Sequence, residues 1–239
     1  MTTFLKAKWE NIVMANYAIA ESILQPYLPK GVALDLYNGK AYVSLVGFLF
    51  KDTKLFNVPI PYLGTFEEIN LRFYVVRKEG NEIKRGVVFI NETIPYKLVA
   101  WMANKLYKEH YTTIPTKHYI NINEDFKEIK YEWLKDNKWN SIALESSTTN
   151  ESMKEGSFEQ FIFEHYYGYT KINEQATEEY RLHHPSWKIN TITKCDINCN
   201  FESMYGTDFA TLDNTTPIAI FIAEGSKVAI EWKRRRLKF

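Results

Sequence analysis

Hydrophobic and polar side chains alternate with a period of two in several short stretches of the chain, and Gly, Pro, Asn or Asp residues separate these stretches. The connection at residues 78–84 carries Gly80 and Asn81 and is typical of a hairpin turn between antiparallel strands. The pattern predicts a mainly β protein. Strands are predicted at residues 40–50, 67–77, 85–93, 157–169, 178–189, 216–223 and 227–233.

The stretches at 40–50 and 67–77 differ in how they distribute their polar residues. Residues 40–50 are apolar on both faces, which is typical of a strand that is covered on both sides. Residues 67–77 carry one apolar face and one row of hydrogen-bonding groups, and this row either faces water from an open sheet or lines a ligand cavity in a closed barrel. The apolar face comprises Ile69, Leu71, Phe73 and Val75, and the polar row comprises Glu68, Asn70, Arg72 and Tyr74.

Two helices are predicted among the strands. The first spans residues 18–28 and ends before Pro29 and Gly31, and the second spans 95–107 with Pro95 near its first position. The polar region at 108–156 is expected to be a turn-rich excursion within one domain. With 239 residues the chain is long enough for a single large β-rich domain of the α+β type, residues 1–239.

Charge and cysteine content exclude several classes of protein. The 30 Lys and Arg residues nearly balance 29 Asp and Glu residues, so neither nucleic acid nor an anionic membrane is an expected partner. The basic run at 233–239 is expected to be a solvated edge, and Cys195 and Cys199 are expected to be independent reduced thiols. Without a signal-peptide pattern or a long apolar segment, a cytoplasmic protein is expected.

Five ordered strings resemble the YqjF-like proteins, a domain of unknown function in the acetoacetate decarboxylase-like superfamily. The resemblance covers nearly the whole chain, and it implies an antiparallel, cone-shaped β-barrel with a central cavity and flanking helices. The strings are GKAYVSLVGFLF, PYLGTFEEINLRFYVVR, RGVVFI, EHYYGYT and YRLHHPSWKI.

The decarboxylase itself uses a lysine that forms a Schiff base with its substrate, and a neighbouring lysine lowers the pKa of that amine. By resemblance, Glu92 and Pro95 match the decarboxylase motif, whereas Tyr96 stands where the nucleophilic lysine would be and Lys97 matches its neighbour. The resemblance also places Glu68 at the position of a catalytic glutamate. A helical projection turns Lys97 onto a polar stripe, so Schiff-base chemistry is not expected at this residue.

On the polar row, Glu68 and Arg72 could bracket a small ligand, with Arg72 binding a carboxylate and Glu68 acting as a base. A structural ion pair or a solvated face is the alternative. His183 and His184 should point to opposite faces, and His184 is favoured as a core histidine over a ligand-binding one.

The sequence therefore predicts a binder of a small organic carboxylate or carbonyl compound, with Glu68 and Arg72 as the best catalytic candidates if it is an enzyme. A non-catalytic ligand-binding or interaction protein is the alternative. No metal and no cofactor are expected, since no suitable motif is present, and homo-oligomerisation is left open. The expected ligand-binding residues are Glu68, Asn70, Arg72, Glu92, Tyr96 and His184.

Overall fold

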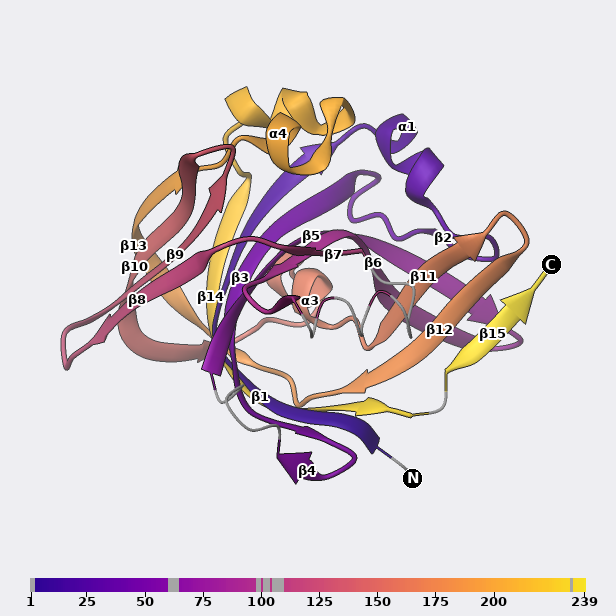
Figure 1. The fold of residues 1–239 in the computed structure, drawn as a ribbon, viewed down its shortest axis with the longest axis horizontal. Coiled ribbons are helices and arrows are strands. Elements are labelled where there is room, and N and C mark those ends of the chain that lie inside the picture. The colour runs from indigo at the N-terminus through magenta and orange to yellow at the C-terminus, as the bar shows by residue number, and fades with distance from the viewer. Residues whose placement is uncertain (1–2, 60–64, 98–99, 101–103, 105–109, 233) are drawn as a thin grey trace.

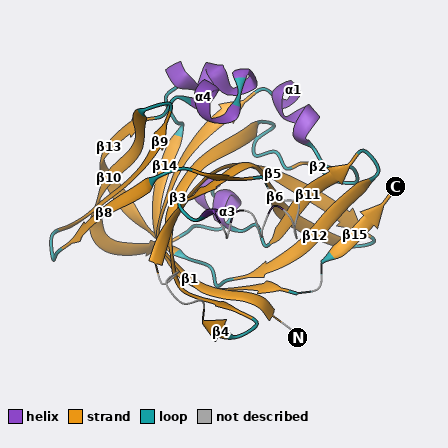
Figure 2. Ribbon diagram, in the orientation of Figure 1, coloured by secondary structure: helices purple, strands orange, loops and turns teal. Residues whose placement is uncertain are grey.

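The computed structural model describes residues 3–59, 65–97, 100, 104, 110–232 and 234–239 (Figure 1). These residues form a mainly β structure whose fifteen strands belong to one hydrogen-bonded sheet, with short helices between them (Figure 2). The elements are β1 Thr3–Ile19, α1 Glu21–Leu24, η1 Gln25–Tyr27, β2 Ala33–Leu34, β3 Ala41–Leu55, β4 Val58–Pro59, β5 Thr65–Glu79, β6 Glu82–Ile94, β7 Tyr111–Thr113, β8 Thr116–Ile122, β9 Phe126–Lys135, β10 Lys138–Ser152, α3 Phe158–Phe163, β11 Tyr167–Asn173, β12 Ala176–His183, β13 Lys188–Asn198, α4 Phe201–Tyr205, η2 Thr207–Asn214, β14 Ala219–Glu231 and β15 Arg235–Lys238.

The sheet closes on itself into a ring of strands. Its order runs β12, β11, β6, β5, β3, β1, β14, and an additional pairing between β12 and β14 joins the two ends. One edge of β14 is shared, because Ile230 and Ala229 pair with β12 whereas Ala223 and Ile222 pair with β13. The sheet therefore branches at β14, and β13, β10, β9 and β8 continue away from the ring.

The two faces of the ring strands are buried in two different hydrophobic clusters. Val43 and Leu45 on β3 belong to an outer cluster together with residues of β9, α4 and η2. Val46 and Phe48 belong to an inner cluster that also contains three consecutive side chains of α3. Since α3 lies within the ring in Figure 1, this inner cluster fills part of its interior. The prediction that residues 40–50 form a strand covered on both sides is confirmed.

The hairpin between β5 and β6 is confirmed, with Glu79 opposite Glu82 and Gly80 in the left-handed region at φ 58°. The prediction of a turn-rich excursion at 108–156 is wrong, because this region holds β7, β8, β9 and β10. In β9, Ile129 and Trp133 are fully buried at alternating positions. Charged residues between them made this strand look like a polar loop.

Other predicted elements also differ from the structure. Residues 157–169 were expected to be a strand, but Phe158–Phe163 form helix α3, whose N-terminus is capped by the Ser157 side chain. The helix expected at 18–28 is shorter, because the first strand β1 extends to Ile19 and only Glu21–Leu24 and Gln25–Tyr27 are helical. The strands expected at 216–223 and 227–233 are one continuous strand, β14.

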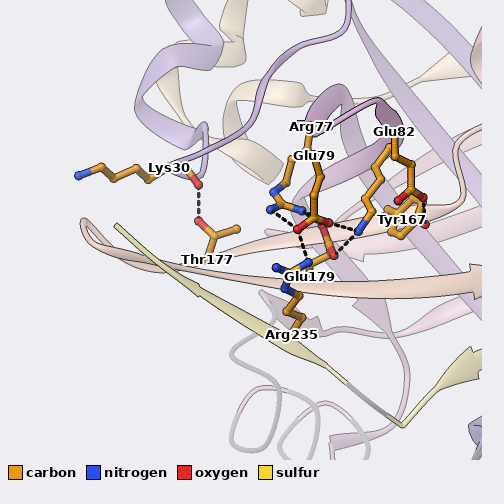
Figure 3. A network of polar contacts seen from close by, with 9 residues as sticks. Lys30, Arg77, Glu79, Glu82, Tyr167, Thr177, Glu179 and Arg235 are labelled. Carbon is orange, nitrogen blue, oxygen red and sulfur yellow. Dashed lines mark hydrogen bonds and ion pairs between the residues drawn. The ribbon is translucent and has the colours of Figure 1, made fainter.

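The basic run at the C-terminus is an exposed edge of the sheet, as expected, and it is also held by ion pairs. The short strand β15 pairs with β12, and its arginines form ion pairs with glutamates of neighbouring strands. Arg236 binds Glu178 at 2.6 Å, and Arg235 contacts Glu79 in the network shown in Figure 3. The C-terminal strand is therefore an exposed edge strand whose arginines are paired with glutamates.

Candidate functional site

The polar row on β5 faces the inner cluster rather than solvent. Glu68 and Asn70 are 3% and 2% exposed, and in the antiparallel register with β3 they lie opposite Phe48 and Val46 of the inner cluster. Arg72, two residues further along the same face, is half-buried. For these side chains the water-facing alternative is therefore wrong.

Glu68, Asn70 and Glu92 form a polar corner of the interior. The Asn70 amide nitrogen donates to Glu68 Oε1 at 3.0 Å, and the Tyr111 hydroxyl donates to Glu68 Oε2 at 3.4 Å. Glu92, which is 4% exposed, lies opposite Asn70 in the register between β5 and β6. Residues paired in this way have Cβ atoms about 4.5–5.5 Å apart, so the structure brings two buried carboxyl groups to either side of one amide.

Among the residues that the structure describes, the contacts of Arg72 are weak. Its Nη2 lies 3.7 Å from the Met14 sulfur, and its guanidinium carbon lies 5.8 Å from the centre of the Tyr74 ring. Within the described residues Arg72 forms no ion pair, and its buried Nε has no hydrogen-bond partner. Glu68 and Arg72 therefore do not form the ion pair that was the alternative to a ligand site.

Beside Arg72, the Tyr74 ring is fixed by a buried chain of hydrogen bonds. The single hydroxyl hydrogen of Ser44 is donated to Asn16 Oδ1 at 2.5 Å, so the Tyr74 hydroxyl donates to Ser44 Oγ at 2.5 Å. The Asn16 amide nitrogen donates in turn to the Ala219 carbonyl at 3.1 Å. Tyr74 thus offers its ring, and not its proton, to the interior.

The junction that follows β6 places its polar residues on different sides. Tyr96 is half-buried and meets the ring of Phe66 edge-on at 5.5 Å, with Phe66 in the inner cluster. Lys97 is exposed, as the helical projection indicated. The helix predicted at 95–107 lies largely outside the described residues, although Lys97, Ala100 and Asn104 are helical.

His183 and His184 have different partners. His183 Nε2 lies 2.7 Å from Glu231 Oε1. His184 lies just beyond the end of β12, half-buried, and its Nδ1 donates to the Pro185 carbonyl at 2.8 Å. Burial, together with the positive charge of Arg72, lowers the pKa of His184 below its usual value, so the imidazole is neutral at pH 7.

Sequence reasoning missed a buried pair formed by Asp35 and His165. His165 follows α3, its side chain is 1% exposed, and its Nε2 lies 3.1 Å from Asp35 Oδ2. Arg85 donates to both oxygens of Asp35, at 2.6 Å and 3.2 Å. Burial lowers the pKa of His165 to about 4, so the ring is neutral and Nε2 donates its proton to the carboxylate. No signal in the sequence joins residues 130 positions apart.

The remaining predictions concern thiols, metals and membranes. Cys195 and Cys199 are both free, as expected. Within the described part of the chain, no group of three or more His, Cys, Asp or Glu side chains is arranged to hold a metal ion. No helix among the described residues is long and apolar enough to cross a membrane.

Comparisons with known proteins agree with this architecture. An acetoacetate decarboxylase-like enzyme from Sphingomonas wittichii RW1 is 10% identical, with a TM-score of 0.66 over 100% of this chain and 94% of that chain. The enduracididine biosynthesis enzyme MppR complexed with pyruvate is 9% identical, with a TM-score of 0.64 over 100% of this chain and 92% of that chain. These two likenesses show an acetoacetate decarboxylase-like fold.

Two sequence matches are more direct. The uncharacterized protein YqjF of Bacillus subtilis (strain 168) is 23% identical over 203 residues, which cover 81% of this chain and 78% of that protein. The model of the family DUF2071, described as an uncharacterized conserved protein, matches residues 6–227. The chain therefore belongs to the DUF2071 family.

Proposed function

We propose that the ring of strands is the cone-shaped barrel of the decarboxylase-like fold and that its interior binds a small organic carboxylate that also carries a carbonyl group. The environment of the Arg72 guanidinium is the observation on which this proposal rests. A guanidinium that is half-buried, lies among apolar side chains and forms no ion pair with the described residues has unused donors for an anion. Charged groups inside a protein are normally paired, so the missing partner is assigned to the ligand.

The chemistry of the surrounding groups favours a 2-oxo or 3-oxo acid. An oxo acid presents carboxylate and carbonyl oxygens together, and a guanidinium edge can donate to both. The Tyr74 ring and the inner cluster would contact the apolar end of such a ligand. MppR, a neighbour in fold, was seen with pyruvate, and this supports the ligand class by analogy only.

Acid-base chemistry, rather than a Schiff base, would be the reaction if the protein is an enzyme. Tyr96 stands at the place of the nucleophilic lysine in the resemblance, and Lys97 is exposed. Glu68, buried, hydrogen-bonded to Asn70 and on the same strand as Arg72, is one candidate base. Reduction with borohydride in the presence of acetoacetate should give no Lys97 adduct by mass spectrometry, and an adduct lost in Lys97→Ala would overturn this ranking.

Isothermal titration and thermal unfolding with pyruvate, acetoacetate and propionate test ligand binding. A ligand at 100 times its Kd stabilises the native state by about 2.7 kcal/mol, and the oxo acids should raise Tm more than propionate does. Arg72→Met should abolish this shift. Arg181→Met, at an exposed arginine over the Tyr167 ring, is the matched control and should bind like the wild type. Retained binding in Arg72→Met would contradict the proposal.

A non-catalytic binding protein on the same fold is the second candidate. The tyrosine at position 96, in place of an amine nucleophile, is the observation that favours it. Binding of an oxo acid without any chemical change of that ligand, measured over hours by NMR, would select this candidate over the enzyme.

A further inference from the structure

One nitrogen of the His184 imidazole donates a hydrogen bond to the backbone, which leaves the other nitrogen as a proton acceptor. A carbonyl oxygen can only accept, so Nδ1 carries the proton that is donated to the Pro185 carbonyl at 2.8 Å. The lone pair therefore resides on Nε2. Fixing the tautomer through a backbone carbonyl is a common way in which proteins present a histidine as a proton acceptor.

Two aromatic rings hold the imidazole in place. The Trp187 ring is stacked on it at 4.2 Å with an interplanar angle of 20°, and the Tyr166 ring lies at 4.7 Å and 31°. Trp187 is 6% exposed and belongs to the inner cluster, so this stack places His184 at the border of the ring interior. Aromatic faces also stabilise a neighbouring cation, and here they would favour the imidazolium that forms on proton uptake.

The charges that act on His184 come from Glu164, Arg72 and His183. Glu164 favours the imidazolium, whereas Arg72 disfavours it. An anionic ligand bound to Arg72 would offset this repulsion, so the same event that brings in the ligand would make His184 a stronger base. His183 is engaged with Glu231.

We propose that His184 Nε2 is the catalytic proton acceptor of the interior site and that it removes a proton from the carbon next to the carbonyl of a 2-oxo acid held by Arg72. This inference rests on the proposed function. The C–H bond breaks and an N–H bond forms at Nε2, while the electron pair moves onto the carbonyl oxygen as an enolate. The guanidinium of Arg72 stabilises this enolate. The imidazolium exchanges its proton with solvent and returns one to the same carbon, which regenerates the 2-oxo acid and the neutral imidazole.

Exchange of the methyl protons of pyruvate for deuterium, followed by proton NMR in D2O, measures this step. The wild-type protein should exchange pyruvate faster than buffer does. His184→Asn keeps a donor for the Pro185 carbonyl and removes the base, so exchange should fall at least about 100-fold while the Kd for pyruvate changes less than about threefold. His183→Asn, the neighbouring histidine, is the matched control and should exchange at the wild-type rate.

Two results would overturn the inference and leave the proposed function standing. One is exchange at the wild-type rate in His184→Asn, and the other is a wild-type protein that binds pyruvate without exchanging its protons. Absence of pyruvate and acetoacetate binding overturns the proposed function and this inference with it. If His184→Asn does not fold, nitrogen-15 NMR of the wild type decides: pyruvate should raise the pKa of His184, and an unchanged pKa refutes the role.

Discussion

Glu179 on β12 is expected to be the most sensitive member of the ion-pair network in Figure 3. Its Oε1 accepts from Lys84 Nζ at 3.1 Å, and its Oε2 accepts from Arg77 Nη1 at 3.0 Å. The Glu179 side chain is 6% exposed, and those of the two cations are only 10–11% exposed. Glu179→Gln keeps the shape of the side chain but leaves two nearly buried cations with less negative charge.

The size of the stability loss in Glu179→Gln depends on which ion-pair partners the two cations keep. Removing one member of a buried pair costs about 3–5 kcal/mol, because the remaining charge is left uncompensated. Both cations keep a contact with Glu79, whose side chain is 30% exposed, so the expected loss lies at or just below this range, at about 2–3 kcal/mol. For a chain of this length that corresponds to a Tm lower by roughly 4–6 °C.

Equilibrium unfolding in urea, followed by tryptophan fluorescence, measures this loss. Arg235→Gln is the control from the same network, because the Arg235 side chain is 53% exposed and such surface pairs contribute about 0–1 kcal/mol. The reasoning is refuted if Glu179→Gln unfolds at the same urea concentration as Arg235→Gln. A changed slope of the transition would indicate altered unfolded-state compactness instead.

Three further results are expected. The pKa of His165 is lowered to about 4, so its contribution to stability is complete above about pH 6.5 and is lost as the pH falls toward 4. In urea unfolding, the free energy of unfolding of the wild type should therefore fall by about 3 kcal/mol more than that of His165→Gln over this pH range. Cys195 is exposed whereas burial strongly raises the pKa of Cys199, so a thiol reagent should modify Cys195 first and Cys199 only after unfolding. Gly225→Ala, whose Cβ would overlap a backbone oxygen, should destabilise by at least about 2 kcal/mol more than Gly39→Ala, where the space is open; thermal unfolding measures both.

The polar row on β5 was predictable because strand geometry is local. Period-two alternation placed Glu68 and Asn70 on one face and Leu71 on the other, and both faces are indeed buried. The turn at Gly80 sets the register of β5 against β6 as far as Arg72, which lies opposite Phe89. A register shift between Leu71 and Arg72, which the sequence did not indicate, then brings Glu92 opposite Asn70. Sequence could not decide whether the row faces water or an interior, because that depends on closure of the ring between β12 and β14.

Helix α3 and strand β9 were mispredicted because the composition of these segments was weighed above their residue pattern. The aromatic residues around Phe161 favoured a strand, but Ser157 and Gln160 stand at the spacing of a helix N-cap, and the Gln160 backbone nitrogen donates to the Ser157 hydroxyl at 3.3 Å. In β9, Ile129, Tyr131 and Trp133 alternate with charged residues and are fully buried. A rule that weighs alternation above local polarity would have found this strand.

The two histidines His165 and His184 show why side-chain contacts beyond element ends could not be predicted, although His184 itself was a candidate residue. Arg72 lies within a strand, so its face follows from its neighbours, whereas His165 and His184 lie just beyond the ends of α3 and β12. A side chain beyond the end of an element is placed by what the chain meets there: Asp35 in one case, and the rings of Tyr166 and Trp187 in the other. In the proposals above, a strand residue, Arg72, would bind the ligand, and a residue beyond a strand end, His184, would accept the proton. A screen of variants for altered chemistry should therefore begin at element ends, and one for altered affinity should begin at Arg72.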